Sequence, residues 1–262
     1  MTNELNFESL LTKLSENITS VELGCYKINE LKMSDQRKIL NMNFNAIEIP
    51  ARISKIFNEF ISSSVSISSD YIQDVLSYIT VDVKPFILAQ IRILTLGDTY
   101  VDRKDKKVYT IDPITDDSVM KLIEPVTINH NNMEITISVP TLKIDENINS
   151  SLLMELGKYK KDISEEDYGK IADLYQLYEI CKYISTIAMG DKQFDFTNCP
   201  INKKIKIVNN LSPRVVSAIN QYIEKSKENG ENKITATNHE TNETIKLDVT
   251  TIFFENTARI ID

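Results

Sequence analysis

Residues 84–97, KPFILAQIRILTLG, constrain the fold most, because they are apolar nearly all round. Pro85 suits the first turn of an α-helix and Gly97 suits its end, so this stretch predicts one helix. A helix that is apolar on every side is usually the centre of a bundle, since other elements have to cover it. Residues 34–97 therefore predict a compact helical unit. Its three preceding helices are expected to begin at Ser34, Pro50 and Ser69.

Three pairs of alternating segments predict β-hairpins, because alternation of apolar and polar residues is typical of half-buried strands. Residues 98–112 alternate on both sides of a Lys-rich turn, and residues 126–140 do so around His130-Asn131-Asn132. We interpret residues 98–142 as a β subdomain inserted between helices. Residues 233–249 predict a third hairpin near the end of the chain.

Helices are expected again after residue 142, and a short one is also expected at residues 4–16. Residues 149–160 predict a helix, residues 164–189 predict the strongest one, and Ser212-Pro213 predicts the start of another. The fold class is thus predicted as α+β, a mostly helical body with two to three hairpins. The expected domains are an N-terminal helical unit (1–97), the inserted β subdomain (98–142) and a C-terminal helical unit with its terminal hairpin (143–262).

Composition excludes several classes of protein. The chain has 262 residues, 42% of them hydrophobic and 26% charged, which is typical of a globular protein. Its net charge of −8 argues against nucleic-acid binding, which depends on cations that neutralise phosphates. Cys25, Cys181 and Cys199 are odd in number and lack Cys-x-x-Cys spacing, which favours a reducing compartment. Without a signal peptide or a long apolar run, we expect a soluble intracellular chain and no membrane contact.

Candidate catalytic and metal-binding residues are few. The six glycines form no phosphate-binding loop. Metal binding by carboxylates and a histidine is one alternative, but interleaved lysines favour a solvated charged turn instead. The residues concerned are Asp102, Asp105, Asp116, Asp117 and His130.

The terminal hairpin raises a related question, since many hairpins of this size are held by zinc between two Cys-x-x-Cys pairs. Thr237 and Glu240 stand where such a pair would place its ligands, and a lone His239 cannot complete a four-ligand site. We therefore expect no metal, no cofactor and no catalysis.

Aromatic residues predict a partner-binding surface instead. Tyr168, Tyr175 and Tyr178 recur at helical spacing, and tyrosine is enriched at protein interfaces. Phe253 and Phe254 follow the terminal hairpin, which is expected to place them against the core or against a partner.

The order of several segments resembles the baseplate hub and hub-assembly proteins of T-even-like contractile-tailed bacteriophages. FILAQIRILTLGD (86–98) precedes ITISVPTL (135–142), and YEICKYI (178–184) precedes FDF (194–196). IKIVNNLSPRVVSAINQYIEK (205–225) and a hairpin then lead to the pair Phe253-Phe254. In that family the hairpin often carries cysteine pairs, which this chain lacks.

The resemblance implies a non-catalytic structural or assembly component of a contractile tail's baseplate hub. Its partners would be other hub, tail-tube or tape-measure proteins, and a homo-oligomer is left open. It would work in the host cytoplasm during assembly and stay in the virion baseplate, or act as a cytosolic tape-measure or tail-assembly chaperone that leaves the virion. An alternative of another class is a small metal-dependent enzyme or regulator, and a third is a bacterial helical adaptor.

Overall fold

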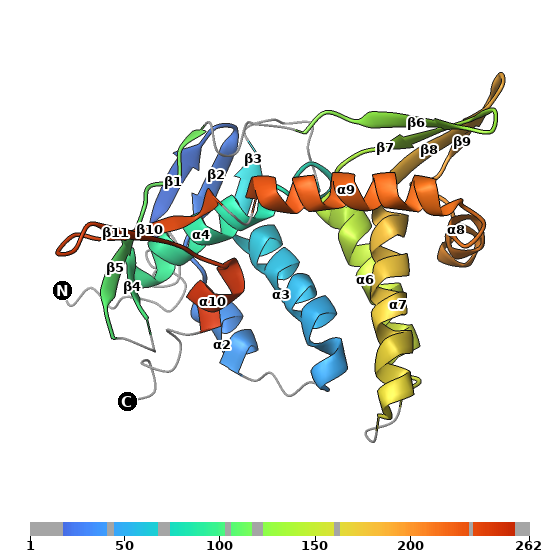
Figure 1. Cartoon of the computed structure of the whole chain (residues 1–262). Coiled ribbons are helices and arrows are strands. Elements are labelled where there is room, and N and C mark those ends of the chain that lie inside the picture. Colours follow the sequence, from blue (N-terminus) through green and yellow to red (C-terminus); the bar gives the residue numbers. More distant parts are fainter. Residues whose placement is uncertain are drawn as a thin grey trace, which may run out of the picture.

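The computed structural model describes residues 18–40, 45–67, 74–102, 106–116, 123–159, 163–230 and 233–254, with positions 38–40, 229–230 and 254 described by their backbone only. This part of the chain is α+β, with eight α-helices and three antiparallel sheets that share eleven strands (Figure 1). The predicted architecture, a mostly helical body with two to three hairpins, is wrong. Most strands find partners far away in the sequence, and alternation within one segment cannot reveal such pairing.

The first sheet has three strands in the order β1-β2-β3. Strands β1 (Ser20–Leu23) and β2 (Tyr26–Asn29) form a hairpin, and β2 also pairs with β3 (Val65–Ile67). Gly24 lies in the tight turn with a φ of 59°, a backbone conformation that glycine adopts without a steric penalty.

Helix α4 (Lys84–Leu96) confirms the prediction made from the apolar stretch. Its residues from Lys84 to Arg92 are all buried, beneath α3 (Ile49–Ser64), β2 and α10 (Val249–Phe254). Helix α2 (Met33–Leu40) packs on α3, and the short 3-10 helices η1 (Ala46–Glu48) and η2 (Val75–Ser77) complete this region. The helices expected at Ser34 and Pro50 are thus present. Ser69 and residues 4–16 lie outside the described part.

The second sheet joins two predicted hairpins in the order β11-β10-β5-β4. Its strands are β4 (Thr99–Val101), β5 (Val108–Ile111), β10 (Thr235–Asn238) and β11 (Glu243–Lys246). Ala236 is paired with Ile111 across this join, and both side chains are buried. The hydroxyl groups of Thr235 and Thr237 donate to the carboxylate of Asp112. The terminal hairpin is therefore held by strand pairing and hydrogen bonds.

The third sheet has the order β6-β7-β8-β9 and projects from one end of the molecule (Figure 1). Its strands are β6 (Val126–His130), β7 (Met133–Ile137), β8 (Ile184–Met189) and β9 (Lys192–Asp195). The two hairpins predicted within 98–142 consequently belong to different sheets, and no single β subdomain holds them both.

Residues 184–189 are a second correction, because the helix predicted over 164–189 ends as α7 (Glu165–Tyr183). The remaining residues form β8, whose Ile184 and Ile187 pair with Ile137 and Ile135 of β7. Their apolar spacing fits a helix or a strand, so the pairing with β7 decides between them. Gly190, with a φ of 58°, then turns the chain into β9.

The remaining helices are α6 (Leu142–Leu156), α8 (Ile201–Val208) and α9 (Pro213–Gly230). Helix α6 begins earlier than predicted, since Thr141 caps it by accepting from the N–H of Ile144. A capping box between Ser164 and Asp167 fixes the start of α7.

The buried apolar side chains form two clusters. The first joins residues between Leu23 and Leu142 to residues 234–253, so it includes the second sheet, α4 and α10. The second cluster combines the third sheet with α6, α7 and α9, and Ile47 and Ala51 extend it to the start of α3. The two clusters meet where α3 packs on α6. The division of the chain at residues 97 and 142 stays a prediction.

Candidate functional site

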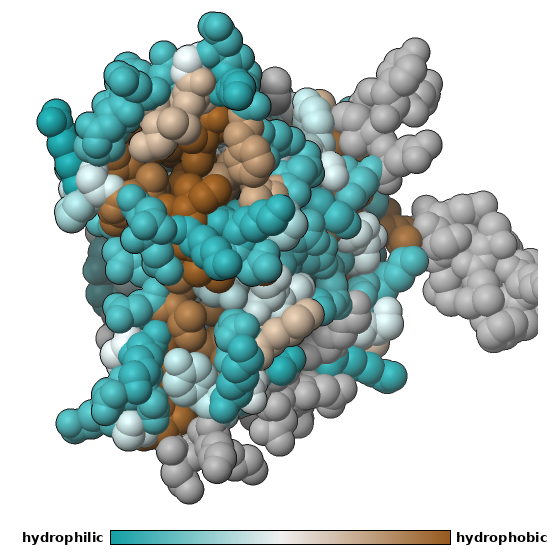
Figure 2. Space-filling view, turned by 90° about the vertical axis from the view of Figure 1, so that its right-hand side faces the viewer, coloured by the Kyte–Doolittle hydropathy of each residue, from teal (hydrophilic) through white to brown (hydrophobic). Residues whose placement is uncertain are grey.

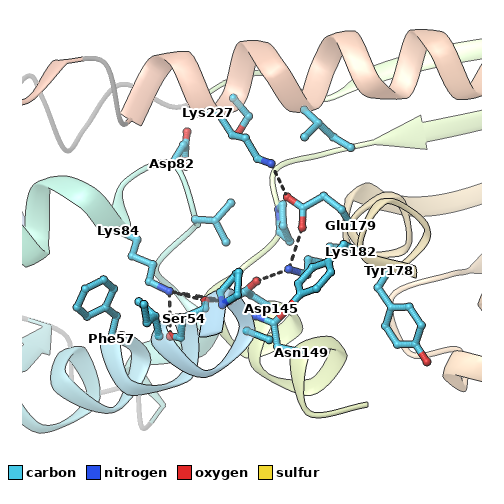
Figure 3. Close-up of a pocket in the computed structure, with 18 of the residues that line it drawn as sticks. Ser54, Phe57, Asp82, Lys84, Asp145, Asn149, Tyr178, Glu179, Lys182 and Lys227 are labelled. Atoms are coloured by element: carbon cyan, nitrogen blue, oxygen red, sulfur yellow. Dashed lines mark hydrogen bonds and ion pairs between the residues drawn. The ribbon is translucent and has the colours of Figure 1, made fainter. Parts of the chain in front are cut away.

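A cleft of about 670 Å³ lies between the two clusters, with walls from α3, α4, α6, α7 and α9 (Figure 3). Charged side chains reach it from four of these helices, whereas Phe57 and Leu152 supply apolar wall. Helix α9 runs along one side of the cleft, and α3 and α6 form the opposite side (Figure 3).

An alternating chain of charges crosses this cleft from α4 to α9. Lys182 Nζ lies 2.8 Å from Asp145 Oδ1 and 2.9 Å from Glu179 Oε2. Lys227 Nζ extends the chain, 3.2 Å from Glu179 Oε1. At the other end, Lys84 Nζ lies 3.9 Å from Asp145 Oδ2. These five charged side chains therefore connect α4, α6, α7 and α9 (Figure 3).

Hydrogen bonds from α3 complete the network. The hydroxyl of Ser54 donates to Asp145 Oδ2 at 2.8 Å, and Lys84 Nζ lies 2.8 Å from Ser54 Oγ and 3.1 Å from its carbonyl oxygen. Asn58 Nδ2 donates to the same carboxylate at 3.4 Å. Asp145 thus accepts from α3 and α7, on either side of its own helix.

Burial and charge act against each other on the pKa values in this network. Burial acts to raise the pKa of Asp145, but the ammonium groups of Lys182 and Lys84 lower it below its usual value. Burial acts likewise on Glu179, and Lys182 and Lys227 lower its pKa. For Lys182, burial lowers the pKa, but Glu179 and Asp145 outweigh it, so the net shift is upward.

Lys84 differs from the other lysines of the cleft. Burial dominates its electrostatics and lowers the pKa of its amine to about 8, although Asp145 acts in the opposite direction. Its 3.9 Å separation from Asp145 is long for a hydrogen bond, so this contact compensates burial only in part. The charged network joins Lys84 of α4 to side chains of α6, α7 and α9, so it connects the two clusters. We call it the internal clamp.

A second feature is the inward side of the third sheet, here called the apolar sheet face. In antiparallel strands, paired residues share a side, so the register assigns eleven positions to it. They are Val126, Ile128, His130, Met133, Ile135, Ile137, Ile184, Ile187, Met189, Lys192 and Phe194.

The apolar sheet face is covered only near the helices. Ile135, Ile137 and Ile184 are buried. Towards the hairpin ends, Met189 is 59% exposed and Phe194 is 45% exposed. Figure 2 shows a hollowed hydrophobic area on this end of the molecule, surrounded by hydrophilic residues. An amphipathic sheet thus extends beyond the helices that cover its base.

Charge is distributed unequally between the two sides of this sheet. None of the eleven positions on the apolar sheet face is acidic, and Lys192 lies there beside Met189. The opposite side carries Glu134 and Asp195, in line with the negative charge of the whole chain. The exposed apolar end of this face therefore carries one basic residue and no acidic one.

The tyrosines predicted for partner binding occupy three different environments on α7. Tyr168 is 56% exposed, whereas Tyr178 is buried in the second cluster. Tyr175 is half-buried and donates its hydroxyl to the carbonyl oxygen of Ile47 at 2.6 Å. Tyr168 thus alone presents most of its ring to solvent, and a binding role for the set stays a prediction.

The predicted phenylalanine pair lies in α10. Phe253 is buried, and its ring centroid lies 5.4 Å from that of Phe57 and 6.0 Å from that of Phe60. The side chain of Phe254 lies outside the described part. Phe253 therefore joins the end of the chain to α3 in the first cluster, and partner binding by the pair stays a prediction.

The residues considered for a metal site are spread over the molecule. Asp102 follows β4 in the second sheet, whereas His130 ends β6 in the third, and Asp116 accepts from the N–H of Gly24. Asp105 and Asp117 lie outside the described part, and His239 lies in the turn of the terminal hairpin. Within the described ranges, no three His, Cys, Asp or Glu side chains gather as a metal site would require.

Sequence reasoning missed both the charged network and the apolar sheet face. The sequence contains one sign of the charged network, because Lys182 is a charged residue between Cys181 and Tyr183 in an otherwise apolar stretch of helix. Met189 was hidden by the helix predicted over 164–189, and no strand was predicted at Phe194. Comparison of the chain with protein-family models, curated proteins and solved structures found no match. None of the helices described here combines the length and the hydrophobicity that crossing a membrane requires.

Proposed function

We propose that the chain is a non-catalytic protein-binding component, structural or assembly, of a contractile phage tail's baseplate hub. The exposed end of the apolar sheet face carries the argument for binding. Met189 and Phe194 leave apolar surface in contact with water on a sheet face whose base is packed against helices, and such surface commonly marks an interaction site. Met189 adds an adaptable side chain that suits a protein partner.

The tail context comes from the order of the segments that resemble hub and hub-assembly proteins. In that context the partner is another hub, tail-tube or tape-measure protein, and its contact surface is apolar with acidic residues near Lys192. The chaperone alternative uses the same surface, since a chaperone for the tape measure also has to cover apolar residues. The two roles differ in whether the chain stays in the finished particle.

Two measurements test the proposal. The first is co-purification of the tagged full chain with tail proteins encoded beside its gene, comparing M189K/F194K with T186K/Q193K. Both variants add two lysines to β8 and β9, but on opposite sides of the sheet. We expect M189K/F194K to lose the partner and T186K/Q193K to keep it, with equal thermal stability. Equal binding by both variants would refute the proposal that the exposed end of the apolar sheet face binds the partner.

The second measurement is a protein inventory of purified virions by mass spectrometry. Presence in the particle supports a resident hub subunit. Absence from the particle, together with capture of a tape-measure fragment by the chain, supports the chaperone role. Absence from virions and no binding to any tail protein would contradict the tail assignment.

A further inference from the structure

Among the strands that the structure describes, β6 is an exposed edge of the third sheet, and its sequence, VTINH, contains no Lys, Arg, Asp, Glu or Pro. Folded proteins usually protect such edges with charges, proline or short length, because an open edge accepts another strand. The opposite edge, β9, is shorter and carries Lys192 and Asp195. The two edges of this sheet are thus protected differently, and β6 lacks charge protection.

The turn of the β6–β7 hairpin fixes which backbone groups of β6 face outward. Asn131 and Asn132 have φ values of 48° and 61°, as a two-residue type I′ turn requires. The pair His130–Met133 that closes such a turn is hydrogen-bonded, so hydrogen-bonded and non-hydrogen-bonded pairs alternate from there. The N–H and C=O groups of Thr127 and Asn129 therefore point away from β7.

Side chains agree with this alternation. Thr127 is paired with Thr136, and their hydroxyl oxygens are 3.4 Å apart, close together as in a non-hydrogen-bonded pair. The outward edge of β6 thus offers two N–H and two C=O groups, all from uncharged residues.

We propose that β6 pairs antiparallel with β6 of a second copy of this chain, about a twofold axis at Ile128. In this register Thr127 of each copy lies opposite Asn129 of the other, so outward N–H and C=O groups meet in four hydrogen bonds. The two copies of Ile128 meet on the apolar sheet face, and Val126 meets His130. No acidic or basic side chain is opposed by one of like charge.

Other symmetric registers fit less well. Shifting the axis by one residue towards the N-terminus sets Asn129 against Pro125, which has no N–H. Shifting it the other way sets Thr127 against Asn131, whose backbone is left-handed in the turn. Only the register centred on Ile128 sets both outward residues, Thr127 and Asn129, opposite outward residues of β6 in the other copy.

Exposed apolar surface gives the second copy a further reason to bind. Val126 is 46% exposed and Ile128 is half-buried, so both lose contact with water when a new strand is added. The product is one eight-stranded sheet in which the two apolar sheet faces are continuous. The pairing does not depend on the tail assignment.

Cysteine cross-linking of the full-length chain tests both the dimer and its register. Directly opposed residues of a non-hydrogen-bonded pair have Cα atoms about 4.5 Å apart, within the range of a disulfide. Ile128→Cys is therefore expected to form a covalent dimer under mild oxidation. Thr127→Cys and Asn129→Cys are each expected to stay monomeric on a non-reducing gel, whereas the double variant T127C/N129C forms a dimer.

Gln193→Cys on β9 is the matched control at the other edge, and mass spectrometry of the linked peptides separates these bonds from any that involve Cys25, Cys181 or Cys199. Thr127 and Asn129 lie on the exposed side of the sheet, so replacing both is not expected to disturb folding. The double variant therefore still tests the register if I128C fails to fold. Cross-linking of Q193C as efficiently as I128C would overturn the proposal, and so would dimers from T127C alone.

Light scattering coupled to size exclusion gives the independent measurement. The unmodified chain is expected at about twice 30.0 kDa. T127K/N129K is expected to be a monomer, because it sets lysine against lysine across the axis. T127K/N129E is expected to restore the dimer, because it sets lysine against glutamate. The measurement is repeated over a series of protein concentrations. If the unmodified chain is a monomer at all of them, the pairing is refuted, and a strand of another protein becomes the candidate to pair with β6.

Discussion

Replacing Asp145 by asparagine is the sharpest test of the internal clamp. The side chain is 6% exposed, and its carboxylate lies against two ammonium groups, Lys182 at 2.8 Å and Lys84 at 3.9 Å. Asparagine keeps the size of the side chain and removes the charge. Both lysines then stay buried without that counter-charge, although Lys182 keeps Glu179.

The expected cost follows from the burial of these charges. Removing one partner of a buried ion pair typically costs about 3–5 kcal/mol, because the remaining charge is uncompensated. Asp145 has two such partners and also accepts from Ser54, so we expect at least about 3 kcal/mol. Since whole domains are stable by about 5–15 kcal/mol, a loss of this size takes a large share of the total.

Urea unfolding at neutral pH, followed by circular dichroism, measures this loss as a lower midpoint at an unchanged slope. Glu243→Gln is the matched control, because its partner Lys107 lies 2.6 Å away and both side chains are 40–45% exposed. An exposed pair of this kind contributes about 0–1 kcal/mol. D145N/K84M should recover part of the loss, since it removes one uncompensated charge. A D145N midpoint no lower than that of E243Q would refute the reasoning.

Three further predictions concern acid stability, the first cluster and the β8–β9 turn. The pKa values of Asp145 and Glu179 are lowered in the folded chain. The stabilisation from these two carboxylates is therefore present above their ordinary pKa values of 3.8 and 4.5 and is lost as the pH falls below those values. Urea midpoints measured at decreasing pH should fall in this range, and less steeply in D145N. Phe253→Ala should cost about 3–5 kcal/mol, because it empties a buried site against two aromatic rings, and a calorimetric scan that finds the unmodified melting temperature would contradict that packing. Gly190→Ala should destabilise the chain by about 1–2 kcal/mol, because the φ of 58° at this position is left-handed. No atom lies within 4 Å of the added methyl group, so the backbone conformation alone accounts for this cost. A higher melting temperature in the variant would contradict the turn geometry.

The sequence was most informative where one segment determines its own structure. Helix α4 was predictable because Gly97 ends it and its residues are apolar on every side. The β6–β7 hairpin was predictable because its strands alternate around a two-residue turn rich in asparagine. Both signals are local, and neither needs knowledge of a partner segment.

Strand β8 shows where local signals stop. Its isoleucines continue the apolar spacing of α7, and the change to a strand comes from pairing with β7, nearly fifty residues earlier. The charged network has the same origin. In the sequence, Asp145 precedes the helix predicted over 149–160, whereas Glu179 and Lys84 look like solvated helix residues. They come together only when four helices meet. Sheet order and side-chain clusters of this kind depend on tertiary contacts, which a single pattern does not encode.

The pairing of β10 with β5 bears on how the chain folds during synthesis. The first cluster combines early residues, such as Phe57 and Tyr109, with Ile234 and Phe253 from the final segment. Because synthesis runs from the N-terminus, residues 234–253 leave the ribosome after every residue of the second cluster. The first cluster must therefore wait, with part of its core open, until residues 234–253 have emerged. A nascent chain that stops before Ile234 should be able to assemble the second cluster, while the first stays incomplete and exposed to chaperones and proteases.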